Sequence, residues 1–140
     1  MDVVLDTSVL SLFLRRNRND LSKEQLVVVH EVERLVKTGR EVITGPVKQE
    51  ILSGLRNENA FDRILEGLHS LRPASVVDED FVNAARFYNA CRDKGVTSSP
   101  SDVLICAIAT RLNATVFSMD KDFDFYQSIL PVNLHQEWRT

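Results

Sequence analysis

Short apolar runs alternate with longer amphipathic stretches along the chain, which predicts strands and helices in turn. The short runs, bounded by turn residues, predict buried strands at 2–5, 41–44, 74–77, 114–117 and 132–134. The amphipathic stretches predict a helix from residue 9 that is broken at 17–20, then helices at about 22–38, from 45, over 61–71, at 78–93, from 99 through 109 and at about 123–128. Strands that alternate with helices are typical of α/β proteins, in which helices cover both faces of a parallel sheet. We expect one three-layer α/β/α domain over residues 1–140, since no repeat or linker interrupts the pattern.

The composition is that of an ordinary globular protein. Hydrophobic residues make up 44% of the chain and charged residues 26%, with 5 Gly and 4 Pro, which argues against a disordered or fibrous chain. The longest apolar run, 103–109, is far shorter than the roughly 20 residues that a membrane-spanning helix needs. The N-terminal segment has Asp2 and Asp6 where a secretory signal would have basic and then apolar residues. We expect a cytoplasmic protein without a membrane segment.

The cysteine and histidine residues form no metal or catalytic motif. Cys91 and Cys106 lie in helical patterns without a C-x-x-C pair, so buried apolar packing is favoured over a disulfide or a metal site. His30, His69 and His135 lie far apart in sequence and lack the spacing of a zinc motif. The acidic residues are the remaining candidates for chemistry.

Five acidic residues follow predicted strands or open predicted helices. Asp6 comes directly after the first strand, Glu50 lies one turn into the helix after the second, and Asp102 opens the apolar helix. Asp120 and Asp122 follow the fourth predicted strand. The carboxyl ends of parallel strands converge at one edge of the sheet, where α/β proteins bind ligands. We expect the five carboxylates to meet there.

Helix capping is the structural alternative for four of these acids. Asp6 and Asp120 are suitable N-caps, Asp102 completes an S-x-x-D capping pattern, and Asp122 would favour a helix N-terminus through the dipole. Glu50 is less easily explained, because it lies beyond the capping positions and has no Lys or Arg three or four residues away. A glutamate at the edge of the core needs a compensating cation.

A divalent metal ion would stabilise clustered carboxylates that otherwise repel one another. Oxygen ligands without Cys or His favour Mg²⁺ or Mn²⁺, and such ions lower the pKa of a bound water that then attacks a phosphodiester. Thr7, Ser8 and Ser118 are candidates to hold water or phosphate through their hydroxyls, with helix capping as the alternative. Lys121, beside Asp120, is a candidate phosphate contact, with an exposed lysine of no function as the alternative.

The net charge does not exclude a nucleic-acid substrate. The chain has 17 basic and 20 acidic residues and a net charge of −3, which argues against binding nucleic acid by bulk electrostatics. Removing the five clustered carboxylates from that balance leaves +2 for the rest of the chain. Arg15, Arg16 and Arg18 form a dense basic cluster, which either contacts RNA phosphates or favours the C-terminus of the preceding helix.

Four segments, taken in their order along the chain, resemble the PIN domain, and most closely the VapC-type toxins of toxin–antitoxin pairs. The segments are VVLDTSVL with Asp6, VITGPVKQEILSGL with Glu50, SPSDVLICAIA with Asp102, and TVFSMDKDF with Asp120 and Asp122. The resemblance implies a ribonuclease that depends on Mg²⁺ or Mn²⁺. In it, the first four of these acids hold the metal and Asp122 assists.

The resemblance also implies a sheet order and protein partners. The implied parallel sheet has the order 3-2-1-4-5. VapC-type proteins are commonly homodimers that a VapB-like antitoxin neutralises near the active site. The exposed sides of the first two helices, including Leu12 and Phe13, are the candidate antitoxin contacts.

An endoribonuclease toxin is the leading prediction, and three other functions stay open. A PIN-domain nuclease of RNA processing and a catalytically silent module that binds RNA or protein would both show the same acids. A phosphotransfer domain also places an aspartate after the first strand. However, Asp6-Thr7-Ser8 lacks the D-x-D of haloacid-type phosphatases, and Glu50 has no place in a receiver site.

Overall fold

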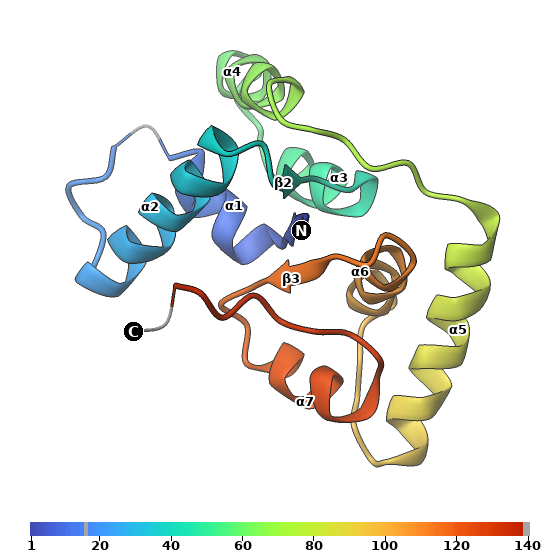
Figure 1. The fold of residues 1–140 in the computed structure, drawn as a ribbon. Helices are drawn as coiled ribbons and strands as arrows, with labels where there is room; N and C mark the ends of the chain where they lie inside the picture. Colours follow the sequence, from blue (N-terminus) through green and yellow to red (C-terminus); the bar gives the residue numbers. More distant parts are fainter. Residues whose placement is uncertain (16, 139–140) are drawn as a thin grey trace.

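The structure contains strands and helices in the predicted order, except that two of the five predicted strands are absent from the described residues. The computed structural model describes residues 1–15 and 17–138. In chain order the elements are β1 (Val3–Leu5), α1 (Thr7–Phe13), α2 (Lys23–Lys37), β2 (Glu41–Val42), α3 (Gly45–Ser53), α4 (Glu58–His69), α5 (Asp78–Asp93), α6 (Pro100–Arg111), β3 (Thr115–Phe117) and α7 (Asp122–Ile129) (Figure 1). Each of these elements overlaps a segment in which the hydrophobic pattern predicts an element of the same type.

The central strand of the parallel sheet is β1, and the strand order is β2-β1-β3. Val4 lies opposite Val42 on one side and Val116 on the other, and Val3, Val4 and Leu5 are fully buried. A strand that has neighbours on both sides and helices over both faces is expected to be apolar throughout. The VVL sequence of β1 meets this requirement.

The two outer strands of the predicted order 3-2-1-4-5 are reduced to single bridges. Pro73 forms a parallel bridge with Ile43 beside β2, and Leu134 forms one with Val116 beside β3. The chain therefore runs beside β2 at one edge and beside β3 at the other, as the predicted order requires. However, residues 74–77 form no strand, so the prediction of a strand there is wrong. The bridge at Pro73 consists of the Ile43 N–H on the Arg72 carbonyl and the Ala74 N–H on the Ile43 carbonyl, both at 2.8 Å, and beyond it the chain is largely exposed as it leaves the sheet for α5.

Helices cover both faces of the sheet. The connection from β1 to β2 runs toward one edge, and the connection from β2 back past β1 to β3 runs toward the other. Right-handed crossovers in opposite directions place their helices on opposite faces. Accordingly, α2 packs against β2, whereas α6 packs against β1 and β3 and carries α5 on its outer side (Figure 1). This arrangement confirms the predicted α/β fold with a parallel sheet between helices.

The apolar run 103–109 enters the core as part of α6. Ile105, Cys106 and Ile108 are at most 1% exposed. Cys91 on α5 is also buried and both thiols are free, which confirms their predicted role in packing. Burial raises the pKa of both thiols above its usual range. Within the described part of the chain, no helix combines the length and the apolar character needed to cross a membrane.

Ion pairs fasten the C-terminal segment to α2. His135 is buried and contacts the carboxylate of Glu31, which also accepts two hydrogen bonds from Arg34 at 2.7 and 2.8 Å. Arg34 and Arg40 both pair with Glu137. Because Arg34 stabilises the charged form, it lowers the pKa of Glu31. Glu31 and His135 are 104 residues apart, so the sequence carried no sign of their contact.

The basic cluster after α1 makes local contacts. Arg18 donates to the Phe13 carbonyl at the end of α1 at 3.2 Å and pairs with Glu33 of α2 at 3.3 Å. Arg15 pairs with an aspartate of the following loop at 3.5 Å. Arg16 lies outside the described residues. The helix-end interpretation is confirmed for Arg18.

Candidate active site

The carboxylates predicted at the strand ends meet at one pocket. The carboxyl ends of β1 and β3, the second turn of α3 and the first turn of α6 surround it. The pocket has a volume of ≈ 420 Å³ and is lined by Asp6, Thr7, Ser8, Glu50, Ser99, Ser101, Asp102 and Asp120. Four of the five predicted acids therefore line the same pocket.

Asp6 is held at the end of the sheet by its backbone. Its N–H donates to the Phe117 carbonyl of β3 at 3.0 Å. The residue occupies the N-cap position of α1, but its side chain makes no capping hydrogen bond. Instead, Asp6 Oδ2 accepts from the hydroxyls of Ser8 and Ser118, at 2.9 and 2.7 Å. The capping alternative is therefore wrong for the Asp6 side chain.

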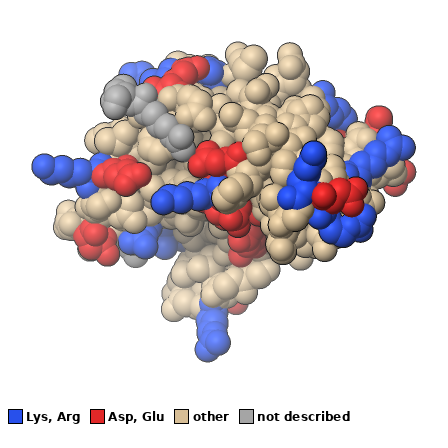
Figure 2. Space-filling view, turned by 90° about the horizontal axis from the view of Figure 1, so that it is seen from below, with Lys and Arg blue, Asp and Glu red and all other residues tan. Residues whose placement is uncertain are grey.

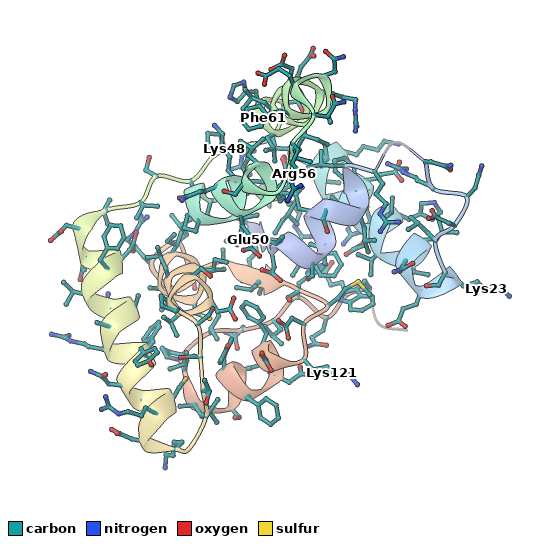
Figure 3. The ribbon with its side chains drawn as sticks, turned by 180° about the vertical axis from the view of Figure 1, so that it is seen from behind. Lys23, Lys48, Glu50, Arg56, Phe61 and Lys121 are labelled. Carbon is teal, nitrogen blue, oxygen red and sulfur yellow. The ribbon has the colours of Figure 1, made fainter. Side chains whose placement is uncertain are left out.

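Glu50 and Asp102 each accept a side-chain hydrogen bond from another helix. Thr7 Oγ1 donates to Glu50 Oε2 at 3.1 Å, and Glu50 points from α3 toward the start of α1 (Figure 3). Tyr126 donates from its hydroxyl to Asp102 Oδ2 at 3.0 Å. The Asp102 N–H donates to Ser99 Oγ at 3.1 Å, so Ser99 is the residue that caps α6. The Ser99 hydroxyl also stabilises the charged form of the Asp102 carboxylate.

Asp120 and Asp122 occupy the turn between β3 and α7. The Asp122 N–H donates to Asp120 Oδ1 at 2.9 Å. Asp120 therefore accepts a backbone N–H at the start of α7, as the capping alternative predicted. Asp122 lies in the first turn of α7, where the helix dipole favours an acid. One carboxylate oxygen from each of Asp102, Asp120 and Asp122 lies within 4.8 Å of the others. Asp122 therefore joins the acids through this cluster, although it does not line the pocket.

The four acids that line the pocket share one pattern, in which one oxygen accepts a hydrogen bond from the protein. The bonded oxygens are Asp6 Oδ2, Glu50 Oε2, Asp102 Oδ2 and Asp120 Oδ1. For Asp6, Glu50 and Asp120, no donor within residues 1–15 and 17–138 reaches the second oxygen, whereas Asp102 is also stabilised by the Ser99 hydroxyl. Hydrogen bonds to one oxygen orient a carboxylate and leave its other oxygen available as a metal ligand.

The pocket concentrates negative charge. No Lys or Arg is found among the described residues that line it. Burial raises the pKa of Asp102 above its usual range, and the negative charges of Asp6 and Asp120 raise it further. Carboxylate oxygens grouped in this way are the ligands that hard divalent ions prefer. The residues present therefore fit a divalent metal ion.

A second group of possible ligands is already neutralised by the protein. Glu31, His135 and Glu137 also bring ligand atoms within 4.8 Å of one another. However, Arg34 binds both glutamates and Arg40 binds Glu137. With these cations in place, the group acts as an ion-pair network, and the acidic pocket differs from it in having no such partner.

The hydroxyls predicted to contact water or phosphate are bonded to the acids. Ser8 and Ser118 both donate to Asp6, and each also accepts a backbone N–H of the β3–α7 turn at 2.9 Å. Thr7 donates to Glu50. The three residues therefore organise the pocket, and their contacts with substrate stay predictions.

Lys121 lies beside the acidic turn but points into solvent (Figure 3). It is exposed and does not line the pocket, so its phosphate contact stays a prediction. On the face shown in Figure 2, acidic and basic side chains are interspersed. On this face the described side chains form no large patch of one sign.

Sequence reasoning missed three residues of the site: Tyr126, Ser99 and Ser101. Tyr126 donates to Asp102, and the pocket is lined by Ser99 at the N-cap of α6 and by Ser101 in its first turn. Tyr126 follows Asp122 by four residues, so the two side chains project from the same face of α7. That spacing was an available signal for Tyr126, whereas nothing in the local sequence singled out Ser101.

A larger pocket of ≈ 770 Å³ lies between α3, α5 and the start of α6. Its lining is mostly apolar and includes Phe81, Tyr88 and Val103. Ser101 lines both pockets, but none of the five acids lines the larger one. The carboxylate chemistry is therefore confined to the smaller pocket.

The parallel sheet and its acidic pocket define a known class of protein. The family model of the PIN domain matches residues 3–127. The chain belongs to the PIN domain family. Membership of this family argues against the phosphotransfer alternative.

Within that family the chain falls in the VapC group. Ribonuclease VapC11 of Mycobacterium tuberculosis is 33% identical over 128 residues, which cover 87% of this chain and 89% of the relative. Two solved structures show the same fold. VapBC2 from Rickettsia felis, bound to a DNA fragment from its promoter, has a TM-score of 0.74 and 18% identity, covering 96% of this chain and 98% of that one. FitAcB from Neisseria gonorrhoeae has a TM-score of 0.72 and 20% identity, covering 99% of both chains.

Proposed function

We propose that this protein is a metal-dependent endoribonuclease that acts as the toxin of a type II toxin–antitoxin pair. The observation that carries the proposal is a single pocket in which four carboxylates meet with no Lys or Arg among the described residues that line it. The similarity to a VapC ribonuclease at 33% identity supports RNA as the substrate. An RNA substrate places the proposed activity in the cytoplasm.

Mg²⁺ or Mn²⁺ is the ion that we propose for the pocket. Asp6, Glu50, Asp102 and Asp120 would hold it, and Asp122 would assist from the adjoining cluster. The lining offers carboxylate and hydroxyl oxygens without sulfur or imidazole, which is the ligand set that these ions prefer. When bound, such an ion lowers the pKa of a water molecule and offsets the charge of the scissile phosphate.

The side chains around the acids hold them in place and receive the RNA backbone. Ser8 and Ser118 orient Asp6, and Thr7 orients Glu50. We propose that these three hydroxyls also contact water or phosphate once the substrate is bound, and that Lys121 turns to a neighbouring phosphate. Outside the five acids the chain carries a net charge of +2, which permits a polyanion to approach.

A VapB-like antitoxin and a second copy of the chain are the protein partners that we propose. The structures with this fold include VapBC and FitAB assemblies, which supports an antitoxin partner. Leu12, expected among the antitoxin contacts, is 6% exposed and belongs to the core, so that expectation is wrong. Phe13, at the end of α1, is half-buried and stays a candidate contact.

Charge-removing substitutions in the pocket test the proposed activity. Asp6→Asn and Asp102→Asn keep the side-chain shape but remove a carboxylate from the ligand set. We expect both variants to lose detectable cleavage of RNA in Mg²⁺ or Mn²⁺, with unchanged circular dichroism spectra. Asp62→Asn, on the exposed side of α4, is the matched control and should cleave like the wild type. Full cleavage by either pocket variant would remove the proposed mechanism.

Two further measurements separate the remaining alternatives. Chelation by EDTA should stop cleavage, and added Mg²⁺ or Mn²⁺ should restore it. A protein that binds RNA but never cuts it with either ion would favour the silent binding module. Expression in a bacterial host should arrest growth if the protein is a toxin, whereas an RNA-processing nuclease should be tolerated.

A further inference from the structure

Tyr126 reaches from α7 to a carboxylate on a different helix. Its hydroxyl donates to Asp102 Oδ2 on α6 at 3.0 Å, and the residue is 1% exposed. The ring packs edge-on against Phe123, with the ring centroids 5.1 Å apart. A side chain enclosed in this way has little rotational freedom. The hydroxyl is therefore held at a fixed point beside Asp102.

We propose that Tyr126 is a positioning residue, which holds Asp102 so that its Oδ1 stays available to the metal ion. The inference rests on the proposed function, because it concerns the same pocket. Tyr126 donates to Oδ2 of this carboxylate from a different helix, whereas the Ser99 hydroxyl, which also stabilises the charged form, lies on the same helix as Asp102. Without the Tyr126 hydroxyl, the Asp102 side chain is held less firmly against the repelling charges of Asp6 and Asp120.

The position of Tyr126 on α7 extends its effect to a second acid. Asp122 lies one turn before Tyr126 on the same helix, and its carboxylate lies within 4.8 Å of those of Asp102 and Asp120. The hydroxyl bond thus ties the helix that carries Asp122 to the helix that carries Asp102. Because clustered carboxylates repel in the absence of an ion, a link between the two helices opposes their separation.

A purely structural role is the competing explanation. A buried tyrosine hydroxyl needs some acceptor, and a backbone carbonyl would serve that need equally well. Here the acceptor is an acid of the pocket, and Asp6 in the same pocket is also held by hydroxyls. The two explanations differ in what they predict for metal binding.

The test compares Tyr126→Phe with the wild type in Mn²⁺ binding, measured by isothermal titration calorimetry. The substitution removes the hydroxyl and keeps the ring. Loss of a contact that orients a metal ligand weakens metal binding by about 10- to 100-fold, so we expect the Kd for Mn²⁺ to rise at least about tenfold. The Mn²⁺ concentration for half-maximal RNA cleavage should rise with it. Tyr88→Phe, at the exposed second tyrosine of the chain, is the matched control and should leave both values unchanged.

A measurement on the unaltered protein covers the case in which Tyr126→Phe does not fold. The chain has 2 tyrosines, so a protein labelled with ¹³Cζ-tyrosine gives two signals, which Tyr88→Phe assigns. On titration with Mg²⁺, the Tyr126 signal should shift in a saturable manner while that of Tyr88 stays in place. A Tyr126 signal that does not respond while calorimetry detects Mg²⁺ binding would overturn the inference.

The outcomes separate this inference from the proposed function. If the wild type binds neither Mn²⁺ nor Mg²⁺, the proposed function fails and the inference fails with it. If the wild type binds Mn²⁺ and Tyr126→Phe binds it equally well, only the inference fails, and Tyr126 has a structural role. If affinity falls in Tyr126→Phe, the double variant with Asp102→Asn should bind no more weakly than Asp102→Asn alone, since the hydroxyl acts through Asp102.

Discussion

Replacing Ser118 by alanine removes a contact that two acids of the pocket share. The hydroxyl of Ser118 donates to Asp6 Oδ2 at 2.7 Å and accepts the Asp120 N–H at 2.9 Å. Ser118 is 9% exposed, so water does not readily take the place of the lost hydroxyl. Ser118→Ala therefore removes one hydrogen bond that orients Asp6, and it leaves the backbone N–H of Asp120 without its acceptor.

The expected magnitude follows from the number of hydrogen bonds that Asp6 keeps. A hydrogen bond to a charged group contributes about 1.5–3 kcal/mol. Ser8 still donates to the same oxygen of Asp6 at 2.9 Å, so we expect the lower end of this range for Ser118→Ala. About 1.4 kcal/mol corresponds to a tenfold change in Kd, which predicts roughly tenfold weaker Mn²⁺ binding. Removing Ser8 and Ser118 together leaves Oδ2 with no donor among the described residues, and we expect an effect larger than the two single effects combined.

Calorimetric titration with Mn²⁺ measures this effect, and RNA cleavage at increasing Mn²⁺ gives the corresponding half-saturating concentration. Ser128→Ala on α7 is the matched control, because the Ser128 hydroxyl donates to a backbone carbonyl of its own helix. Circular dichroism shows whether each variant is folded. Wild-type Mn²⁺ affinity in a folded double variant at Ser8 and Ser118 would refute the view that these hydroxyls orient Asp6.

Three further predictions concern stability and thiol reactivity. Arg111→Ala should lower the free energy of unfolding by about 3–5 kcal/mol in urea titrations. Arg111 binds both oxygens of the fully buried Asp80 carboxylate, at 2.8 and 3.0 Å, and the substitution leaves that carboxylate without its cation. An unchanged transition would show that Asp80 is neutral or solvated. Two arginines lower the pKa of Glu137 from an ordinary 4.5 to about 2. The stability from this contact is therefore present above pH 4.5 and is lost as the pH falls toward 2. In thermal melts over that pH range, the Tm of Glu137→Gln should fall less than the Tm of the wild type. Cys91 and Cys106 are 0% exposed and burial raises the pKa of each thiol, so neither should react with a disulfide reagent near pH 7 until the protein is unfolded, and rapid labelling of the native protein would contradict this packing.

The strand order shows where prediction from the pattern stops. The apolar run of β1 required burial on both faces, so its central place in a parallel sheet was predictable. The apolar residues at 74–77 gave the same type of signal but form no strand. A strand needs a ladder of partners, and after the bridge at Pro73 the backbone leaves the sheet edge. Hydrophobicity does not report whether such partners exist.

The hydrogen bonds of the pocket were not predictable for a related reason. Ser8, Thr7 and Ser118 were identified as polar side chains near the acids, but which oxygen each would bind depends on the packing of separate elements. Ser118 and Asp6 are 112 residues apart, and their contact exists because β1 and β3 are neighbours in register. Tyr126 was missed because its partner Asp102 lies on another helix.

The sequence by itself determined the alternation of strands and helices and the positions of the acids after the strands. Both follow from local rules, since side-chain periodicity sets the element and the carboxyl ends of parallel strands lie at one edge. Only the tertiary structure decided that four of the acids line one pocket and which oxygen of each accepts a hydrogen bond from the protein. That outcome depends on distances between segments far apart in the chain, because a hydrogen bond forms only when packing brings donor and acceptor to about 3 Å.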